Sequence, residues 1–311
     1  MKPSRVFGIA LIALLLPAAL VAQGITAPPS GDNQKASVTQ YIGPVSVTIE
    51  YSSPDVTAPD GTDRRGKIYG ELVHWGFKDE DFGTCTECPW RAGANENTTI
   101  TFSHDVEVEG KPLAAGTYGL HMAAGPEEWT IIFSNNTSSW GSYFYDPAED
   151  ALRIKVKPEK AEYRHWLTYD FYDRQPTRTS VRLWWEDLAV PFTISVPNLN
   201  EIYVNAMRDD LRGAAGFTWN SWVQAAAFCL QNEINLQEAE EWTRTAVETP
   251  WLAGKNLQSL AVLAQLEQAN GKKEQALRTA QEALTLTTND RQRQAVQGII
   301  DEIKEESATQ E

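Results

Sequence analysis

The segment from Trp90 to Glu96 carries the residue types best suited to chemistry in this chain of 311 residues. It reads Trp-Arg-Ala-Gly-Ala-Asn-Glu and precedes a strand-like stretch. The planar guanidinium of Arg91 could bind a carboxylate or phosphate at two points, Glu96 could act as a base, and Asn95 could orient a ligand. Polar side chains on a loop held by a rigid scaffold often carry function, so we predict a ligand site here.

The same residues also fit a structural role. Arg91 can pair with Glu96 and tie down the loop, while Asn95 caps backbone groups. Gly93 can supply an unusual backbone dihedral. Charged pairs in loops are commonly structural, so both interpretations stay open at the level of sequence.

Aromatic side chains form the second group of candidates, since the chain has 11 tryptophans. Trp140 and Tyr143 join Trp90 as predicted ligand contacts because exposed aromatic faces suit sugar rings and peptide segments. The alternative is that these rings fill core layers, which aromatic residues dominate in ordinary proteins.

The three cysteines are Cys85, Cys88 and Cys229. In an exported protein, Cys85-Thr86-Glu87-Cys88 is most simply a small disulfide that pins a loop, with a redox pair and half of a metal site as alternatives. Cys229 lies in an apolar helical run and is predicted to be a buried free thiol. The histidines are dispersed, and no second Cys or His pair has ligand spacing. We therefore predict no metal site and no cofactor.

Hydrophobic side chains alternate with polar ones over residues 37–197, and turn residues separate the segments. This period of two predicts antiparallel sheets packed face to face, and the predicted fold class is α+β: an antiparallel β-sandwich, jelly-roll-like, followed by a small α-helical repeat region. The clearest inward-facing sets are Val45, Val47, Ile49 and Tyr51; Val181, Leu183 and Trp185; and Phe192, Ile194 and Val196.

Four motifs in this region occur in a recognisable order. They are Pro89–Glu96, Ala115-Gly116-Thr117-Tyr118-Gly119-Leu120, Glu128–Phe133 and Trp140-Gly141-Ser142-Tyr143. Their order and spacing resemble the exported bacterial domain of unknown function family 2911, from about Val38 to Val196. The resemblance implies a fold and an exported location, and no catalytic residue or reaction.

Near Pro197 the hydrophobic period changes to 3.6, which predicts helices over residues 198–306. Small residues recur 37 positions apart, so that Ala227 is matched with Ala264 and Ala239 with Ala276. The second copy resembles a tetratricopeptide unit, and we predict a degenerate tetratricopeptide-like region. An unrelated helical bundle is the alternative.

Residues 1–22 have the pattern of a signal peptide, with Lys2 and Arg5 before a short apolar run and small residues near Ala22. We expect a flexible leader over 23–36 and a disordered tail over 307–311. The mature chain should then be periplasmic or extracellular, with no membrane span after signal cleavage.

The net charge of −15 disfavours binding to nucleic acid, whose phosphates it repels. No glycine-rich phosphate loop and no Gly-x-Ser-x-Gly motif occur. The sequence therefore favours an exported, non-catalytic binding or interaction protein whose ligand is an unknown protein, peptide or glycan in the cell envelope. The alternative is a cell-envelope hydrolase or carbohydrate-active enzyme that uses Glu96 and Arg91.

Overall fold

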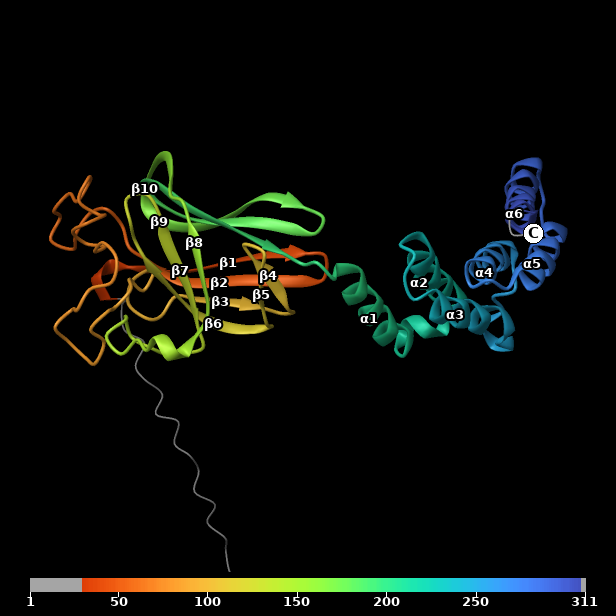
Figure 1. Cartoon of the computed structure of the whole chain (residues 1–311), viewed down its shortest axis with the longest axis horizontal. Coiled ribbons are helices and arrows are strands. Elements are labelled where there is room, and N and C mark those ends of the chain that lie inside the picture. Colours follow the sequence, from red (N-terminus) through yellow and green to blue (C-terminus); the bar gives the residue numbers. More distant parts are fainter. Residues whose placement is uncertain (1–29, 309–311) are drawn as a thin grey trace, which may run out of the picture.

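The computed structural model describes residues 30–308, in which ten strands form two antiparallel sheets and six helices follow (Figure 1). The predicted α+β class, with sheets first and helices after, is confirmed. The predicted signal peptide and most of the predicted leader lie outside the described residues, as do residues 309–311.

The larger sheet has six strands in the order β1-β2-β3-β6-β7-β8, and the smaller has four in the order β5-β4-β10-β9. The larger sheet contains β1 (Gln34–Ile42), β2 (Val45–Ser53), β3 (Thr99–Phe102), β6 (Gly116–Ala123), β7 (Trp129–Ser134) and β8 (Asp150–Val156). The smaller contains β4 (Val106–Val108), β5 (Lys111–Leu113), β9 (Glu159–Gln175) and β10 (Arg178–Ser195).

The core lies between the sheets, and the predicted inward-facing residues of β2 and β10 are all buried there. On β10 the inward set changes from odd to even positions between Trp185 and Val190. The change coincides with the left-handed backbone of Glu186, which has a φ of 56°, and with an irregularity in the pairing with β9 on either side of it. One strand of the fold therefore reads as two alternating segments in the sequence.

The start of the sandwich differs from the prediction. Residues 34–36, expected in the leader, begin β1 and pair with Tyr51, Ser52 and Ser53 of β2. Edge strand β1 has one neighbouring strand and is mostly solvent-exposed. Its first residues therefore need not alternate between apolar and polar side chains, which is the pattern that marks a strand in the sequence. At the other end, the last helix continues to Ala308, two residues into the predicted tail.

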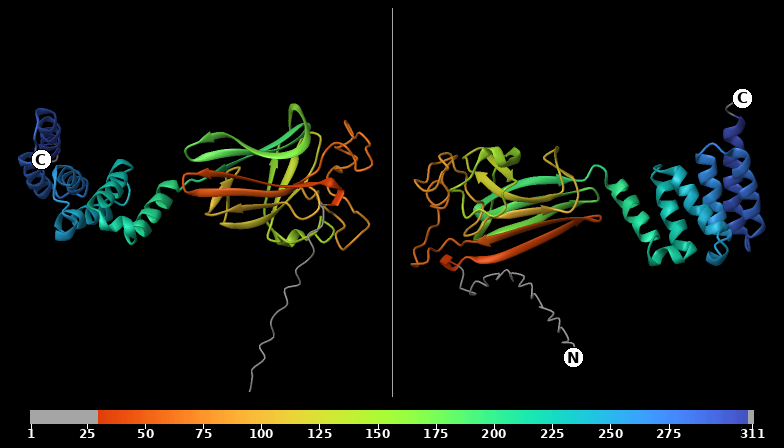
Figure 2. Two further views of the ribbon diagram at one scale, coloured as in Figure 1. Left: turned by 180° about the vertical axis from the view of Figure 1, so that it is seen from behind. Right: turned by 90° about the horizontal axis from the view of Figure 1, so that it is seen from below.

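The helical region contains α1 (Leu199–Leu211), α2 (Trp219–Gln231), α3 (Leu236–Glu248), α4 (Leu257–Ala269), α5 (Lys273–Thr285) and α6 (Asp290–Ala308). Successive helices from α2 onwards pack on one another, as Figure 2 shows. Helix α1 joins the two parts, because Leu199 and Ile202 belong to the core of the sandwich whereas Val204 and Leu211 belong to a helical core.

The matching of the two helix pairs needs one correction. Helix α3 begins at Leu236 and α5 at Lys273, which is the predicted spacing of 37, and both Ala239 and Ala276 are fully buried. Helix α2 begins at Trp219 and α4 at Leu257, which is a spacing of 38. Ala226, not Ala227, is therefore the counterpart of Ala264, and both are fully buried. The connection between α2 and α3 has one residue more than the connection between α4 and α5, which accounts for the shift.

We expect Ala264→Leu to destabilise the helical region by about 1–3 kcal/mol, because the added atoms must enter a filled space between helices. The control is Gln281→Leu, at an exposed position on α5, which should change stability by less than about 0.5 kcal/mol. Chemical unfolding followed by the helical circular dichroism signal measures both. Equal effects of the two substitutions would show that Ala264 is not a close-packing position.

Candidate functional site

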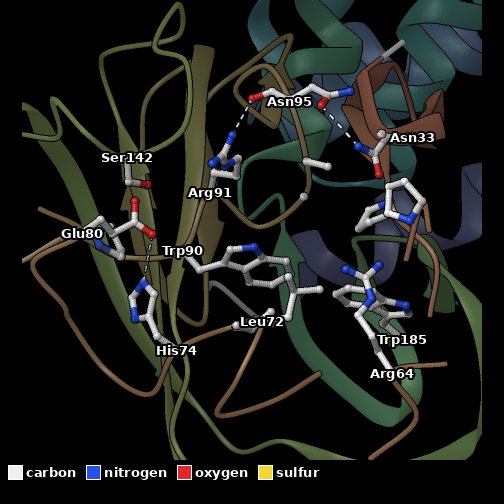
Figure 3. Close-up of a pocket in the computed structure, with 17 residues that line it drawn as sticks. Asn33, Arg64, Leu72, His74, Glu80, Trp90, Arg91, Asn95, Ser142 and Trp185 are labelled. Atoms are coloured by element: carbon white, nitrogen blue, oxygen red, sulfur yellow. Dashed lines mark hydrogen bonds and ion pairs between the residues drawn. The ribbon is translucent and has the colours of Figure 1, made fainter. Parts of the chain in front are cut away.

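A cavity of about 290 Å³ lies at the end of the sandwich where the long connection between β2 and β3, residues 54–98, covers the sheets (Figure 3). This end is opposite the one from which α1 leaves (Figure 1). The connection is held to the sheet by main-chain pairing, since Trp90 exchanges two hydrogen bonds of 2.8 Å with Met122 on β6. That pairing fixes the backbone of the Trp-Arg segment beside the cavity.

Three of the six predicted ligand contacts line the cavity, namely Trp90, Arg91 and Asn95. The other three, Glu96, Trp140 and Tyr143, are not among its lining residues. Trp140 is 52% exposed and forms an isolated main-chain bridge with Glu96. Tyr143 packs edge-on against Phe82, with ring centres 5.1 Å apart.

Arg91 does not pair with Glu96, so the predicted structural ion pair is wrong. Its Nη1 donates a hydrogen bond of 2.9 Å to the main-chain oxygen of Asn95, and the guanidinium lies 5.6 Å from the centre of the Tyr143 ring. Within residues 30–308, Arg91 forms no ion pair with a carboxylate. The Arg91 guanidinium therefore lines the cavity with no carboxylate in contact among the described residues.

Glu96 faces a different part of the surface. Its carboxylate contacts Lys35 Nζ at 3.2 Å and accepts a hydrogen bond of 3.1 Å from Ser52 Oγ. A hydrogen bond from its own main chain, followed by those from Lys35 and Ser52, lowers the pKa of Glu96. A lowered pKa makes the carboxylate a weaker base. The structure thus separates the two residues that the enzyme hypothesis combined.

The loop geometry around Gly93 also differs from the expectation. The positive φ values belong to Ala92 (53°) and Asn95 (57°), not to Gly93. A Cβ at Gly93 would lie 2.5 Å from Thr98 Oγ1, so close approach is what requires glycine there. The side chain of Asn95 contacts the N-terminal segment, accepting a hydrogen bond of 3.2 Å from Asn33 Nδ2.

One wall of the cavity is apolar. Trp90 stacks on Trp185, with ring centres 6.3 Å apart and an interplanar angle of 19°, and Leu72 lines the same wall. Trp129 lies edge-on to Trp90 at 6.4 Å. The aromatic stack fixes the shape of this wall and offers a flat surface to an apolar group.

The opposite end is polar, and the sequence did not reveal it. Glu80, His74 and Ser142 lie together there, with Arg91 close by (Figure 3). Both ring nitrogens of His74 are buried and have no hydrogen-bond partner among the described residues, and His74 Nε2 lies 4.0 Å from Glu80 Oε1. Buried polar atoms are normally bonded, so these nitrogens mark a place where a ligand or water is needed.

Behind this end lies a buried histidine. Nδ1 of His121, on β6, lies 3.0 Å from Ser142 Oγ, and both residues are 2% exposed. Burial first, and the charge of Arg91 second, lower the pKa of His121 from its usual 6.5 to about 4. His121 is therefore neutral at neutral pH and holds Ser142 in place without adding charge.

His121 should make the protein less stable in acid. The unfolded chain binds a proton at His121 below pH 6.5, whereas the folded chain binds it only near pH 4. Stability due to this group is therefore constant above pH 6.5 and falls by about 3 kcal/mol as the pH drops to 4. The free energy of unfolding, measured at pH 7 and at pH 4, should fall less between the two pH values for His121→Gln than for the unchanged protein. Equal losses would contradict the lowered pKa.

The predicted disulfide between Cys85 and Cys88 is confirmed. Both cysteines are buried, and they pack with Ile132 of β7 and with Tyr145. Ile132 lies on the face of β7 that is turned away from the sandwich core, and the cysteine loop covers it. Cys229 is a buried free thiol, as predicted. Burial is the main cause that raises the pKa of its thiol to about 11.

Within residues 30–308, no group of three or more His, Cys, Asp or Glu side chains is placed to hold a metal ion. None of the helices in the same range has the length and apolarity needed to cross a membrane.

These features define an antiparallel two-sheet domain with an end cavity, joined to a helical region. A family model described as protein of unknown function (DUF2911) matches residues 33–194, just over half of the chain, and the chain belongs to this family. The match takes in both sheets except the last residue of β10, and the cavity lining except Gly31, and it ends before α1. Searches of curated proteins and of solved structures gave no match.

Proposed function

We propose that the protein is an exported, non-catalytic binding protein whose β-sandwich holds a small ligand in the end cavity. The observation that carries the proposal is a cavity lined by two polar groups with unmet interactions among residues 30–308: Arg91 has no carboxylate partner, and the ring nitrogens of His74 have no hydrogen-bond partner. A volume of about 290 Å³ is near the lower limit of small-molecule sites, which span about 300–1,000 Å³. This size favours a small molecule over a protein segment or an extended glycan.

The helical region fits a second role as a tetratricopeptide-like module that binds a protein partner. Two helix pairs with small buried residues at repeating positions support it. The exposed rings of Phe217 and Trp251 contact each other with centres 5.9 Å apart and offer an apolar contact on this region. The signal-like sequence of residues 1–22 supports export, and the disulfide is compatible with it because disulfides are typical of oxidising compartments.

The alternative hydrolase or carbohydrate-active enzyme would need Glu96 and Arg91 to act on one substrate. No observation favours it, since the two side chains make separate contacts and Glu96 is not a cavity residue. Substrate screening tests it directly. Turnover that Arg91→Ala and Glu96→Ala both abolish, with folding intact, would overturn the binding-only proposal.

Native mass spectrometry of the protein purified from its own cell envelope tests the binding proposal. We expect a small bound molecule on the unchanged protein and on Glu96→Gln, and none on Arg91→Gln. A ligand that Glu96→Gln removes and Arg91→Gln leaves in place would move the site away from the cavity. The absence of any bound molecule, with no binder found in a metabolite screen, would refute the proposal.

A further inference from the structure

The end cavity combines two opposite charges that do not neutralise each other. Arg91 has no carboxylate partner within residues 30–308, and Glu80 lines the same cavity. Among residues 30–308, Glu80 has one ion-pair contact, with His74 at 4.0 Å, and this contact is attractive only when His74 is protonated. Arg91 and Glu80 lie more than 4.0 Å apart at the atoms that carry charge, since they form no salt bridge. An ion or polar group could fit between them.

From this arrangement, and resting on the proposed binding function, we infer that the ligand is a zwitterion with an apolar body, namely a free α-amino acid with an apolar or aromatic side chain. Its carboxylate would bind the Arg91 guanidinium, and its ammonium would bind Glu80. Its side chain would lie against Trp90 and Leu72. Each part of the inferred ligand thus has one matching part of the cavity (Figure 3).

The carboxylate position follows from the geometry of Arg91. Nη1 is used by the main-chain oxygen of Asn95, and Nη2 has only a long contact of 3.5 Å with Tyr143 Oη. A Cβ at Gly141 would lie 3.0 Å from the guanidinium carbon, so the loop after β7 packs on Arg91 and limits its movement. A fixed guanidinium with free N–H groups binds a carboxylate at little entropic cost.

The second cation of the cavity does not compete for this role. The guanidinium of Arg64 donates hydrogen bonds to the main-chain oxygens of residues 55–57, at 3.1–3.4 Å, and lies at the other end beside Trp185 (Figure 3). Its contacts fix the segment that forms the cavity edge. Arg91 is therefore the cation that faces the polar end.

The ammonium position follows from Glu80, His74 and Ser142. A neutral His74 ring has one acceptor nitrogen, and the Ser142 hydroxyl also accepts, so three acceptors surround the polar end. A ligand ammonium has three donors to match them. A simple anion would be attracted by Arg91 but repelled by Glu80. A simple cation would be attracted by Glu80 but repelled by Arg91. Only a ligand with both charges satisfies both residues.

Calorimetric titration of the mature protein with three probes of one shape tests the inference. L-phenylalanine has both charges, 3-phenylpropanoate lacks the ammonium, and phenethylamine lacks the carboxylate. We expect each of the latter two to bind about 10–100-fold more weakly than L-phenylalanine, because each loses a hydrogen-bonded charge. The same comparison is made for a smaller side chain with L-leucine, its analogue without the ammonium group and its analogue without the carboxylate.

Two matched substitutions test which cavity residue binds each charged group of the ligand. Arg91→Gln should weaken binding of L-phenylalanine and 3-phenylpropanoate and strengthen binding of phenethylamine, because it removes the charge that repels the amine. Glu80→Gln should weaken binding of L-phenylalanine and phenethylamine and strengthen binding of 3-phenylpropanoate for the same reason. Glu96→Gln, outside the cavity, should alter none of the three. The order of the probes on the unchanged protein needs no substitution, so it decides the matter even if a variant fails to fold.

Equal affinity for the three probes, or no affinity for either amino acid, would overturn the inference. If the amino acids do not bind while an envelope-derived ligand is lost in Arg91→Gln, the ligand class is wrong and the binding function stands. If both the amino acids and any envelope-derived ligand are absent, both conclusions fail.

Discussion

Replacing Trp185 with alanine is expected to destabilise the β-sandwich by about 3–5 kcal/mol. The side chain is 1% exposed and lies at the junction of the core and the cavity. It stacks on Trp90 and contacts Tyr69, and its Nε1 donates a hydrogen bond of 3.2 Å to the main-chain oxygen of His165. The substitution leaves a large space, removes an aromatic stack and loses the indole hydrogen bond.

The matched control is Trp184→Ala, one position earlier on β10 and on the opposite face. Trp184 is half-buried, and its ring lies under the guanidinium groups of Arg164 and Arg182, at 4.0 and 4.2 Å. Losing these contacts should destabilise the protein by about 1–2 kcal/mol. Urea unfolding followed by tryptophan fluorescence measures both variants. A larger loss for Trp184→Ala would mean that the two faces of β10 have been assigned the wrong way round.

Replacing Arg244 with methionine should destabilise the helical region by about 3–5 kcal/mol. Arg244, on α3, reaches two buried carboxylates: Nη2 lies 2.9 Å from Glu240 Oε1 and 2.6 Å from Glu267 Oε1 on α4. Glu240 also pairs with Lys272 at 2.8 Å. Among residues 30–308, Arg244 is the one cation that forms an ion pair with Glu267. The substitution therefore leaves a buried charge unpaired between the two helix pairs.

A second substitution separates the ion pair from general packing. Burial raises the pKa of Glu267, so the neutral isostere in Glu267→Gln should restore most of the stability when combined with Arg244→Met. Arg278→Met breaks an exposed pair with Glu274, separated by 3.7 Å, and should have little effect. Thermal unfolding by circular dichroism compares the variants. No recovery in the double variant would show that Arg244 stabilises through packing alone.

Regular patterns in the sequence predicted the scaffold well. Side chains such as Val47, Ile49 and Leu183 face the core as their alternation indicates, because burial on one face of a sheet imposes a period of two. The repeat of small residues likewise located the paired helices, and Ala239 and Ala276 are buried as expected. The pattern failed at β1, which has a single neighbouring strand, and at the irregularity near Glu186.

The cavity could be predicted only in part. Trp90, Arg91 and Asn95 were found because they form one contiguous polar and aromatic segment. His74 and Glu80 come from an irregular segment, and Ser142 comes from a turn after β7, so no spacing connects them. The assumed Arg91–Glu96 pair failed for a related reason. Asn95 has a positive φ between the two residues, and each side chain has a nearer partner.

The most direct test of the ligand site is a crystal structure of the protein purified from its own cell envelope and kept out of contact with added amino acids. We predict electron density for a small molecule between Arg91 and Glu80, with its apolar part against Trp90 and Leu72. Density for a ligand on the exposed surface near Trp140 and Glu96, with only water in the cavity, would contradict this account.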